Sequence, residues 1–332
     1  MLAKASSKVW GMGAAVLILA GFMVCSVLFG VYQTSLEEVF GAFTQFNGSN
    51  SHIVIQEVRV PRAIIASFVG ACLGVSGVYM QTLTRNPLAD AGILGVNSGA
   101  ALFIVVAFVF FGVGSVSQFI WIAFAGAALS SIAVYTLGSV GRSGLTPMTL
   151  TLAGAAFSAF ATSLTHGILT LDERANDEIL FWIAGSIAGR KLDILIAVLP
   201  YMSAALLLSL FYAPALNVLS LGEDVAKGLG QRTVLIKAVA GLIVVLLAGG
   251  SVAAAGPIAF IGLIVPHIAK YFAGTDLRWA VPYSAFVGAI ILVAADTASR
   301  FIAFPKEMPI SVMTAIIGAP FFIYTARKGV WK

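Results

Sequence analysis

Residues 242–250 read LIVVLLAGG and residues 204–212 read AALLLSLFY, two stretches without a charged side chain. A helix needs about 20 mainly apolar residues to cross a bilayer, because it rises about 1.5 Å per residue and the hydrocarbon core is about 30 Å thick. Both stretches lie inside longer apolar runs, and neither alternates polar and apolar residues as the strands of a membrane β-barrel do. The sequence therefore predicts an all-α integral membrane protein.

The composition of the whole chain agrees with this prediction. Of the 332 residues, 60% are hydrophobic and only 10% are charged, and the mean hydropathy is +1.01. Soluble domains are roughly 45–50% apolar and about 25% charged. Cys25 and Cys72 are the two cysteines and both fall in apolar runs, so neither a disulfide framework nor a thiolate metal site is expected.

About ten transmembrane helices are expected, and the segments between them are too short for a soluble domain. The chain is therefore expected to form a single transmembrane domain over residues 1–332. The first helix follows two lysines, has no small-residue cleavage site after it and is expected to stay uncleaved. The expected spans are 9–31, 61–83, 94–112, 116–138, 147–168, 194–213, 233–252, 257–273, 280–297 and 309–326.

Positive charge predicts the orientation of the bundle. Cytoplasmic loops are enriched in lysine and arginine, and an N-terminus inside the cell places the larger share of the 19 such residues on the cytoplasmic side. Both termini are then cytoplasmic. The 34 glycines, many inside spans, are typical of membrane helices that pack closely through small residues.

The first of four polar stretches is RNPLADAGILGVNSGA at residues 85–100, on the cytoplasmic side of the second expected span. Proline ends a helix and disfavours the helical conformation for the residue before it, while glycine permits tight turns and close packing. On these grounds a plain loop and a functional turn remain equally open. The residues expected to shape the turn are Arg85, Asn86, Pro87, Gly95 and Gly99.

The second stretch is LSLGEDVAKGLGQR at residues 219–232. Leu221, Val225 and Leu229 are four residues apart and predict one apolar face of a short helix, with acidic residues exposed at its start. Such a helix can dock a soluble partner or lie flat at the membrane interface. The pattern alone does not separate these two interpretations.

The third stretch is GPIAFIGLIVPHIAK at residues 256–270. Pro257 suits the first turn of a helix, whereas Pro266 is expected to kink or end that helix near the cytoplasmic surface. His267 has no second histidine or carboxylate near it in sequence. A structural role at a helix end is therefore favoured over a proton relay or a metal ligand.

The fourth set is EVRVPR at residues 57–62 and DTASR at residues 296–300. Arg59, Arg62 and Arg300 fall on the outer side, against the usual distribution of positive charge. Snorkelling to lipid headgroups explains them slightly better than docking of an acidic partner, although arginine pairs well with carboxylates.

Several functions are disfavoured by what the sequence lacks. No acidic or basic residue falls in the middle of an expected span, whereas ion-coupled carriers usually have ionisable groups or broken helices there. The chain has no Gly-Lys dipeptide, so it carries no P-loop. Three separated histidines form no catalytic arrangement. A non-catalytic subunit without a metal or cofactor of its own is expected.

Four motifs, taken together and in this order, resemble the permease subunit of iron-siderophore, haem and vitamin B12 ABC importers, the FecCD type of type II importers. They are RNPLADAGILGVNSGA, LSLGEDVAKGLG, GPIAFIGLIVPHIAK and MPISVMTAIIGAPFFIY. The similarity runs from about Arg59 to the C-terminus. Two departures are Ala91, where proline is usual, and Arg190-Lys191-Leu192, where a tryptophan is often found after GSxxG.

The resemblance implies roles for individual residues. The outer arginines Arg59, Arg62 and Arg300 would receive glutamates of a substrate-binding protein. The turn before the fifth span would gate the pathway on the cytoplasmic side at Thr146, Pro147 and Met148. The coupling helices, at about 216–231, would contact an ATPase through Leu221, Gly222, Glu223, Asp224, Val225, Ala226, Leu229 and Gly230.

The resemblance also implies an assembly in the plasma membrane of a bacterium. A second permease, identical or paralogous, two ATPase subunits and a substrate-binding protein would be the partners, with no nucleic acid. ATP and magnesium would bind the ATPase. The expected cargo is a chelated metal, first a ferric siderophore, with haem or vitamin B12 as alternatives. A secondary transporter that works alone and a membrane scaffold or receptor are the alternatives from other classes.

Overall fold

A computed structural model describes residues 5–30, 34–140, 146–172, 179, 182–303 and 307–327. Within these residues the secondary structure is helical, and no strand is present. The helices are α1 (Ala5–Leu28), α2 (Leu36–Thr44), α3 (Asn50–Ile53), the π-helix η1 (Val54–Arg59), α4 (Val60–Thr84), the 3₁₀ helix η2 (Ala91–Leu94), α5 (Val96–Phe111), α6 (Val116–Ser139), α7 (Pro147–Leu171), α9 (Leu192–Ser220), α10 (Glu223–Gly228), α11 (Thr233–Ala255), α12 (Ile261–Ala273), α13 (Leu277–Ile302) and α14 (Ile310–Arg327).

The ten expected spans are confirmed in order. Among the described residues, seven helices are long and apolar enough to cross a membrane, and α5, α12 and α14 are shorter apolar helices. The boundaries differ by a few residues at several spans, and most at two of them. The second begins earlier than expected, because α3, η1 and α4 form one continuous helix from Asn50 to Thr84. The sixth, α9, is longer and continues past Pro200 and Pro214 to Ser220.

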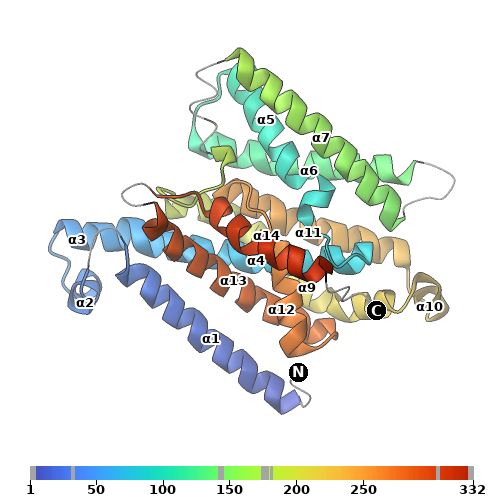
Figure 1. Cartoon of the computed structure of the whole chain (residues 1–332), viewed down its shortest axis with the longest axis horizontal. Helices are drawn as coiled ribbons and strands as arrows, with labels where there is room; N and C mark the ends of the chain where they lie inside the picture. The colour runs from blue at the N-terminus through green and yellow to red at the C-terminus, as the bar shows by residue number, and fades with distance from the viewer. Residues whose placement is uncertain are drawn as a thin grey trace.

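Helix α4 lies at the centre of the bundle and packs against α9, α11, α12 and α13 (Figure 1). Two of its glycines lie directly against the backbone of neighbouring helices. A Cβ atom at Gly77 would overlap the backbone of Gly262 in α12, and one at Gly70 would overlap the carbonyl of Gly288 in α13. Close backbone approach of this kind holds membrane helices together, as the glycine content predicts.

Helices α5, α6 and α7 form a second group, seen above α4 in Figure 1. Gly99 in α5 leaves no room for a Cβ atom beside Ser130 in α6, and Gly154 in α7 lies against the carbonyl of Ile93 in η2. The prediction of close packing at Gly99 is therefore confirmed. These contacts position α7 against the turn that follows α4.

The RNPLAD turn joins α4 to η2 and α5 through local hydrogen bonds. Arg85 ends α4 in the left-handed conformation, with a φ of 49°. The side chain of Asn86 accepts a hydrogen bond from the backbone N–H of Leu88, just after Pro87. The side chain of Asp90 accepts one from the N–H of Gly92 at the start of η2, and both bonds are 2.9 Å long. Gly95, with a φ of 70°, connects η2 to α5. The expected tight turn is present.

The expectations around α12 need correction. Pro257 lies before the helix and not in its first turn, because Phe260 has a φ of 68° and a right-handed helix begins only after it. Pro266 lies inside α12 and does not end it. His267 lies in the middle of the helix and not at its end, with Nδ1 2.8 Å from the carbonyl oxygen of Leu263.

Helix α1 lies along the edge of the bundle (Figure 1), and most of its surface is exposed. It packs against α13. At its N-terminal end the hydroxyl of Tyr283 donates a hydrogen bond to the carbonyl of Lys8, at 2.6 Å. Arginine side chains, described below, hold its other end. Contacts at its two ends therefore attach α1 to the bundle.

We expect Gly77→Ala to destabilise the protein by about 1–3 kcal/mol, because the added methyl group separates α4 from α12. Gly13→Ala in α1 is the control, since no atom lies within 4 Å of the Cβ position there. Thermal unfolding in detergent measures both. Equal midpoints for the two variants would contradict direct contact between the α4 and α12 backbones.

Candidate functional site

The predicted functional residues lie at opposite ends of α4. This helix has 25 residues, which corresponds to a rise of about 37 Å at 1.5 Å per residue. Arg62 lies in its first turn and Arg85 directly after its last residue. The outer arginines and the coupling segment, residues 219–232, are therefore on opposite sides of the bundle, with α10 at one end of the view in Figure 1 and α3 at the other.

The outer arginine cluster consists of Arg59, Arg62 and Arg300 with two carboxylates, Asp296 and Glu307. Arg62 Nε lies 2.8 Å from Asp296 Oδ1, and Arg62 Nη1 lies 2.6 Å from Glu307 Oε2. Arg300 Nη2 lies 2.6 Å from Asp296 Oδ2. One carboxylate thus joins two guanidinium groups inside the protein.

The cluster also caps the C-terminal end of α1. The last carbonyl groups of a helix have no partner within the helix, and lipid offers none. Arg59 and Arg300 donate hydrogen bonds to these groups at 2.6–2.9 Å. The accepting carbonyls belong to Ser26, Val27, Leu28 and Phe29.

The arginines are not on the outer surface, where both sequence interpretations place them. The exposed fractions of Arg59, Arg62 and Arg300 are 4%, 5% and 2%, because carboxylates and backbone carbonyls of the same chain surround the guanidinium groups. Snorkelling to lipid headgroups is therefore wrong. Docking stays a prediction, and the accessible acidic group of the cluster is Glu307, whose side chain is 33% exposed.

The coupling segment forms one short helix, α10, between two glycine turns. Gly222 has a φ of 138° and Gly230 a φ of 79°, conformations that favour glycine. The expected boundaries of 216–231 are too wide at the start, because α9 continues to Ser220. Ala226 is fully buried and attaches α10 to the bundle.

The outer side of α10 carries the expected apolar face. Leu221, Val225 and Leu229 are 70%, 48% and 66% exposed, and Asp224 beside them is exposed as well. Exposed leucine and valine on an otherwise polar helix indicate a binding surface. The structure therefore brings Leu221, Asp224, Val225 and Leu229 together on one accessible surface, whereas the predicted coupling residue Ala226 is buried.

Glu223 differs from the rest of this surface. It is half-buried and not exposed as expected, because its Oε2 atom lies 2.5 Å from Lys237 Nζ in α11. Its Oε1 atom lies 3.3 Å from Lys227 Nζ. The hydrogen bond from Lys237 holds the pKa of Glu223 below its usual range, so the Glu223 carboxylate is ionised at neutral pH. This ion pair connects α10 to the membrane helix α11.

The predicted gate lies at the start of α7. Thr146 Oγ1 accepts a hydrogen bond from the N–H of Thr149, whose own hydroxyl accepts one from the N–H of Thr146. Pro147 occupies the first helical position, which it favours, and Met148 is 72% exposed. Residues 141–145 of the predicted gate turn lie outside the described residues. The gating role stays a prediction.

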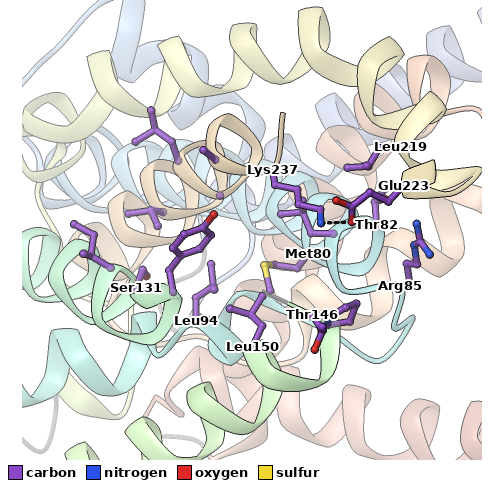
Figure 2. Close-up of a pocket in the computed structure, with 18 of the residues that line it drawn as sticks. Met80, Thr82, Arg85, Leu94, Ser131, Thr146, Leu150, Leu219, Glu223 and Lys237 are labelled. Carbon is purple, nitrogen blue, oxygen red and sulfur yellow. Dashed lines mark hydrogen bonds and ion pairs between the residues drawn. The ribbon is translucent and has the colours of Figure 1, made fainter. Parts of the chain in front are cut away.

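An inner cavity of about 350 Å³ lies between the coupling segment and the predicted gate. Glu223 and Lys237 form one side of its mouth, and Thr146 with Leu150 forms another (Figure 2). Arg85 lies at the same end as the Glu223–Lys237 pair in this view. Apolar side chains of α4, α6 and α11 line the interior. The predicted coupling residue Glu223 and the predicted gate residues Thr146 and Pro147 thus line one cavity.

A second cavity of about 300 Å³ lies between α5 and α7 and was not predicted. Its surface is mainly apolar, with polar side chains set into it. A signal was present in the sequence, because Ser158, Thr162 and His166 are four residues apart and lie on one side of α7. Hydroxyl, amide and imidazole groups line this cavity. They belong to Asn97, Ser98, Ser158, Thr162, Thr165 and His166.

The described residues contain no group of three or more histidine, cysteine, aspartate or glutamate side chains that could hold a metal ion. The ten apolar helices of the described residues and the exposed apolar face beside α10 are typical of one class of protein, the membrane permease that receives its energy from a partner subunit.

The chain belongs to the FecCD transport family, whose profile matches residues 17–328. It is 50% identical over 326 residues to the "Probable siderophore transport system permease protein YfiZ" of Bacillus subtilis, covering 98% of each chain. It is 40% identical to the ferric enterobactin transport system permease protein FepD of Escherichia coli, covering 91% of this chain and 90% of that protein.

A solved structure shows the same fold. It is "An inward-facing conformation of a putative metal-chelate type ABC transporter", with a TM-score of 0.84 and 29% identity, covering 96% of this chain and 98% of that one. The chain is thus a non-catalytic, multi-pass permease subunit of a bacterial ABC importer in the inner membrane, and a separate subunit hydrolyses ATP.

We expect Asp296→Asn to destabilise the protein by about 3–5 kcal/mol, because it leaves two buried guanidinium groups without their shared carboxylate. Glu37→Gln, an exposed carboxylate on α2, is the control and should leave stability within about 0.5 kcal/mol of the natural protein. Unfolding in detergent measures both changes. A stable Asp296→Asn protein would show that the cluster does not depend on this charge.

Proposed function

We propose that this permease imports a ferric siderophore, as one of two permease subunits assembled with two ATPase subunits and a substrate-binding protein. The observation that supports this cargo is the second cavity, between α5 and α7, whose mainly apolar wall includes six polar side chains. Its wall offers hydroxyl, amide and imidazole groups, which can hydrogen-bond to the oxygen-rich surface of an iron chelate. The names of the two relatives, one for siderophores and one for ferric enterobactin, support the same class of cargo.

A siderophore also fits because it carries its own metal shell. The described residues offer no multi-ligand metal site, and a chelate needs none, since its iron is already fully coordinated. Weak hydrogen bonds along a wall let a solute pass, whereas tight coordination would retain it. Haem and vitamin B12 are the alternative cargoes, and their uptake is measured in the experiment below.

Movement of the ATPase subunit would be transmitted to the permease through α10. Its exposed apolar face would sit against an ATPase subunit, and the Glu223–Lys237 pair would pass movement of α10 to α11. ATP binding would close the ATPase dimer, shift α10 and alter the start of α7, where Thr146, Pro147 and Met148 are proposed to form the gate. The cargo would then pass between the two permeases, and this chain would bind no cofactor of its own.

The binding protein would dock on the outer side. The described part of the outer arginine cluster contains three arginines and two carboxylates, Asp296 and Glu307, so its net charge is positive. Glu307 is partly exposed, and a carboxylate of the binding protein could take its place on Arg62. Docking would then exchange one ion pair for another.

Uptake into proteoliposomes tests the cargo. The permease, co-purified from its native membrane with its ATPase and any second permease, is reconstituted with the partner binding protein and supplied with ferric hydroxamate, haem or cobalamin. We expect ATP-dependent uptake of the ferric hydroxamate. ATP-driven uptake of haem or cobalamin alone would show that the proposed cargo is wrong. Uptake driven by an ion gradient without ATP would show that the proposed energy source is wrong.

We expect the double variant Leu221→Ser and Leu229→Ser to weaken binding of the ATPase at least tenfold, because the two exposed leucines form most of the α10 face and buried apolar anchors dominate interfaces, with hot spots worth about 2 kcal/mol or more. Tyr271→Ser, a 66% exposed residue at the end of α12, is the control. Co-purification and ATP-driven uptake measure the effect. Full ATPase binding by the double variant would show that α10 is not the coupling surface.

We expect Arg59→Gln combined with Arg300→Gln to abolish docking of the binding protein and to leave the ATPase bound, since truncating one side of a desolvated ion pair can cost about 2–5 kcal/mol. Lys191→Gln, an exposed charge outside the cluster, is the control.

Because the two arginines also cap α1, Glu307→Gln provides a variant that leaves the α1 cap in place. It frees Arg62 for an incoming carboxylate, and we expect tighter docking. Unchanged affinity in Glu307→Gln, or intact docking in the double arginine variant, would show that the binding protein does not use the cluster.

A further inference from the structure

Residues of two neighbouring membrane helices, α6 and α11, line the inner cavity. Helices α6 and α11 approach closely near Gly249, where a Cβ atom would lie 3.3 Å from the Cβ atom of Ala127. Toward their cytoplasmic ends, Ile132 and Tyr135 of α6 and Leu242 of α11 line the cavity. Because Ile132 and Leu242 line the cavity and are also more than half exposed, we infer an opening of the cavity to the surface between these two helices, at the cytoplasmic half of the bundle.

The surface around this opening is apolar. Ile132 and Leu137 of α6 are 58% and 57% exposed, and Val234 and Leu242 of α11 are 73% and 52% exposed. Exposed apolar side chains on both sides of the opening, on two membrane-spanning helices, place it against the hydrocarbon of the bilayer. A molecule that enters from the side is then a lipid.

The walls of the inner cavity are charged at its cytoplasmic mouth and apolar in its interior. Its interior is mainly apolar, while Arg85, Lys237 and Glu223 stand at its cytoplasmic mouth with the hydroxyls of Thr82 and Thr146. Along α11, the lining residues extend from Lys237 to Val245, a rise of about 12 Å. This approaches half of the roughly 30 Å hydrocarbon core, the depth of one leaflet.

The charge at the mouth selects the headgroup. Arg85 is exposed, held by its left-handed backbone at the end of α4, and forms no ion pair with the described carboxylates. Lys237 is paired with Glu223. The mouth therefore carries two positive charges against one negative charge. Arginine and lysine bind phosphate through charge-assisted hydrogen bonds, so an anionic headgroup fits better than a zwitterionic one.

We propose that the inner cavity binds one anionic phospholipid of the cytoplasmic leaflet. One acyl chain lies between α6 and α11, and the phosphate lies between Arg85 and Lys237. The phosphate competes with Glu223 for Lys237, so the bound lipid acts on the ion pair that holds α10. This inference rests on the membrane location of the chain and on no particular cargo.

Native mass spectrometry of the assembled transporter tests the proposal. The complex is released from bilayers that contain equal amounts of phosphatidylglycerol and phosphatidylcholine, and the lipid that stays bound is identified. We expect one phosphatidylglycerol for each copy of this chain. Arg85→Gln should lower its retention about tenfold, as loss of one hydrogen bond to a charged group implies. Arg278→Gln, an exposed arginine at the same end of the bundle, should not.

A second variant fills the cavity without touching its charges. Gly241 of α11 lines the cavity, and no atom lies within 4 Å of its Cβ position, so Gly241→Leu occupies the space of the acyl chain without a backbone clash. Gly21→Leu in α1 has the same open surroundings and is the matched control. We expect loss of the bound lipid in Gly241→Leu and none in Gly21→Leu.

Three results would overturn the proposal. Equal lipid retention in Gly241→Leu and Gly21→Leu would show that the lipid lies elsewhere. Equal retention of phosphatidylcholine would show that the charge at the mouth does not select the headgroup. Displacement of the bound lipid by soluble glycerol phosphate would show a site for the free anion and not for a membrane lipid.

Discussion

Direct contact between the backbone of α4 and those of α12 and α13 is the constraint on which the rest of the structure depends. In a bilayer, apolar side chains gain little by leaving lipid for another helix, so close packing and hydrogen bonds must hold the bundle together. Gly70 and Gly77 allow that contact. Because α4 is fixed on several sides, the residues at its two ends are fixed as well. The outer arginine cluster and the RNPLAD turn are therefore held at a set distance across the membrane.

The ion pairs of the described residues lie at the two ends of the bundle and differ in kind. On the outer side, Asp296 joins Arg62 and Arg300 in a buried network that also satisfies the last carbonyls of α1. On the cytoplasmic side, Glu223 and Lys237 form a half-buried pair that connects a surface helix to a membrane helix. The first arrangement resists change, since removing one partner leaves charge uncompensated. The second is accessible to competing ions.

The sequence predicts features that depend on nearby residues. The ten spans, the turn at residues 85–100 and the apolar face of α10 follow from runs and spacings within a few turns of a helix. Features that join distant segments could not be predicted in this way. The partners of Glu223 and Arg62, Lys237 and Asp296, lie 14 and 234 residues away. The arginines were therefore placed on the surface, although Asp296 and Arg300 are four residues apart, a spacing that indicates an ion pair within one helix. The polar row on α7 carried a similar signal.

The attachment of α1 has a consequence for the order in which the chain is made. Helix α1 is synthesised before α13, and the carbonyl of Ser26 is bound by Arg300, 274 residues later in the chain. At about 5–20 residues per second, the ribosome needs on the order of tens of seconds to travel from Ser26 to that arginine. Until then α1 has uncapped carbonyls at its end and no α13 beside it. This helix therefore reaches its final place only after most of the bundle has been made.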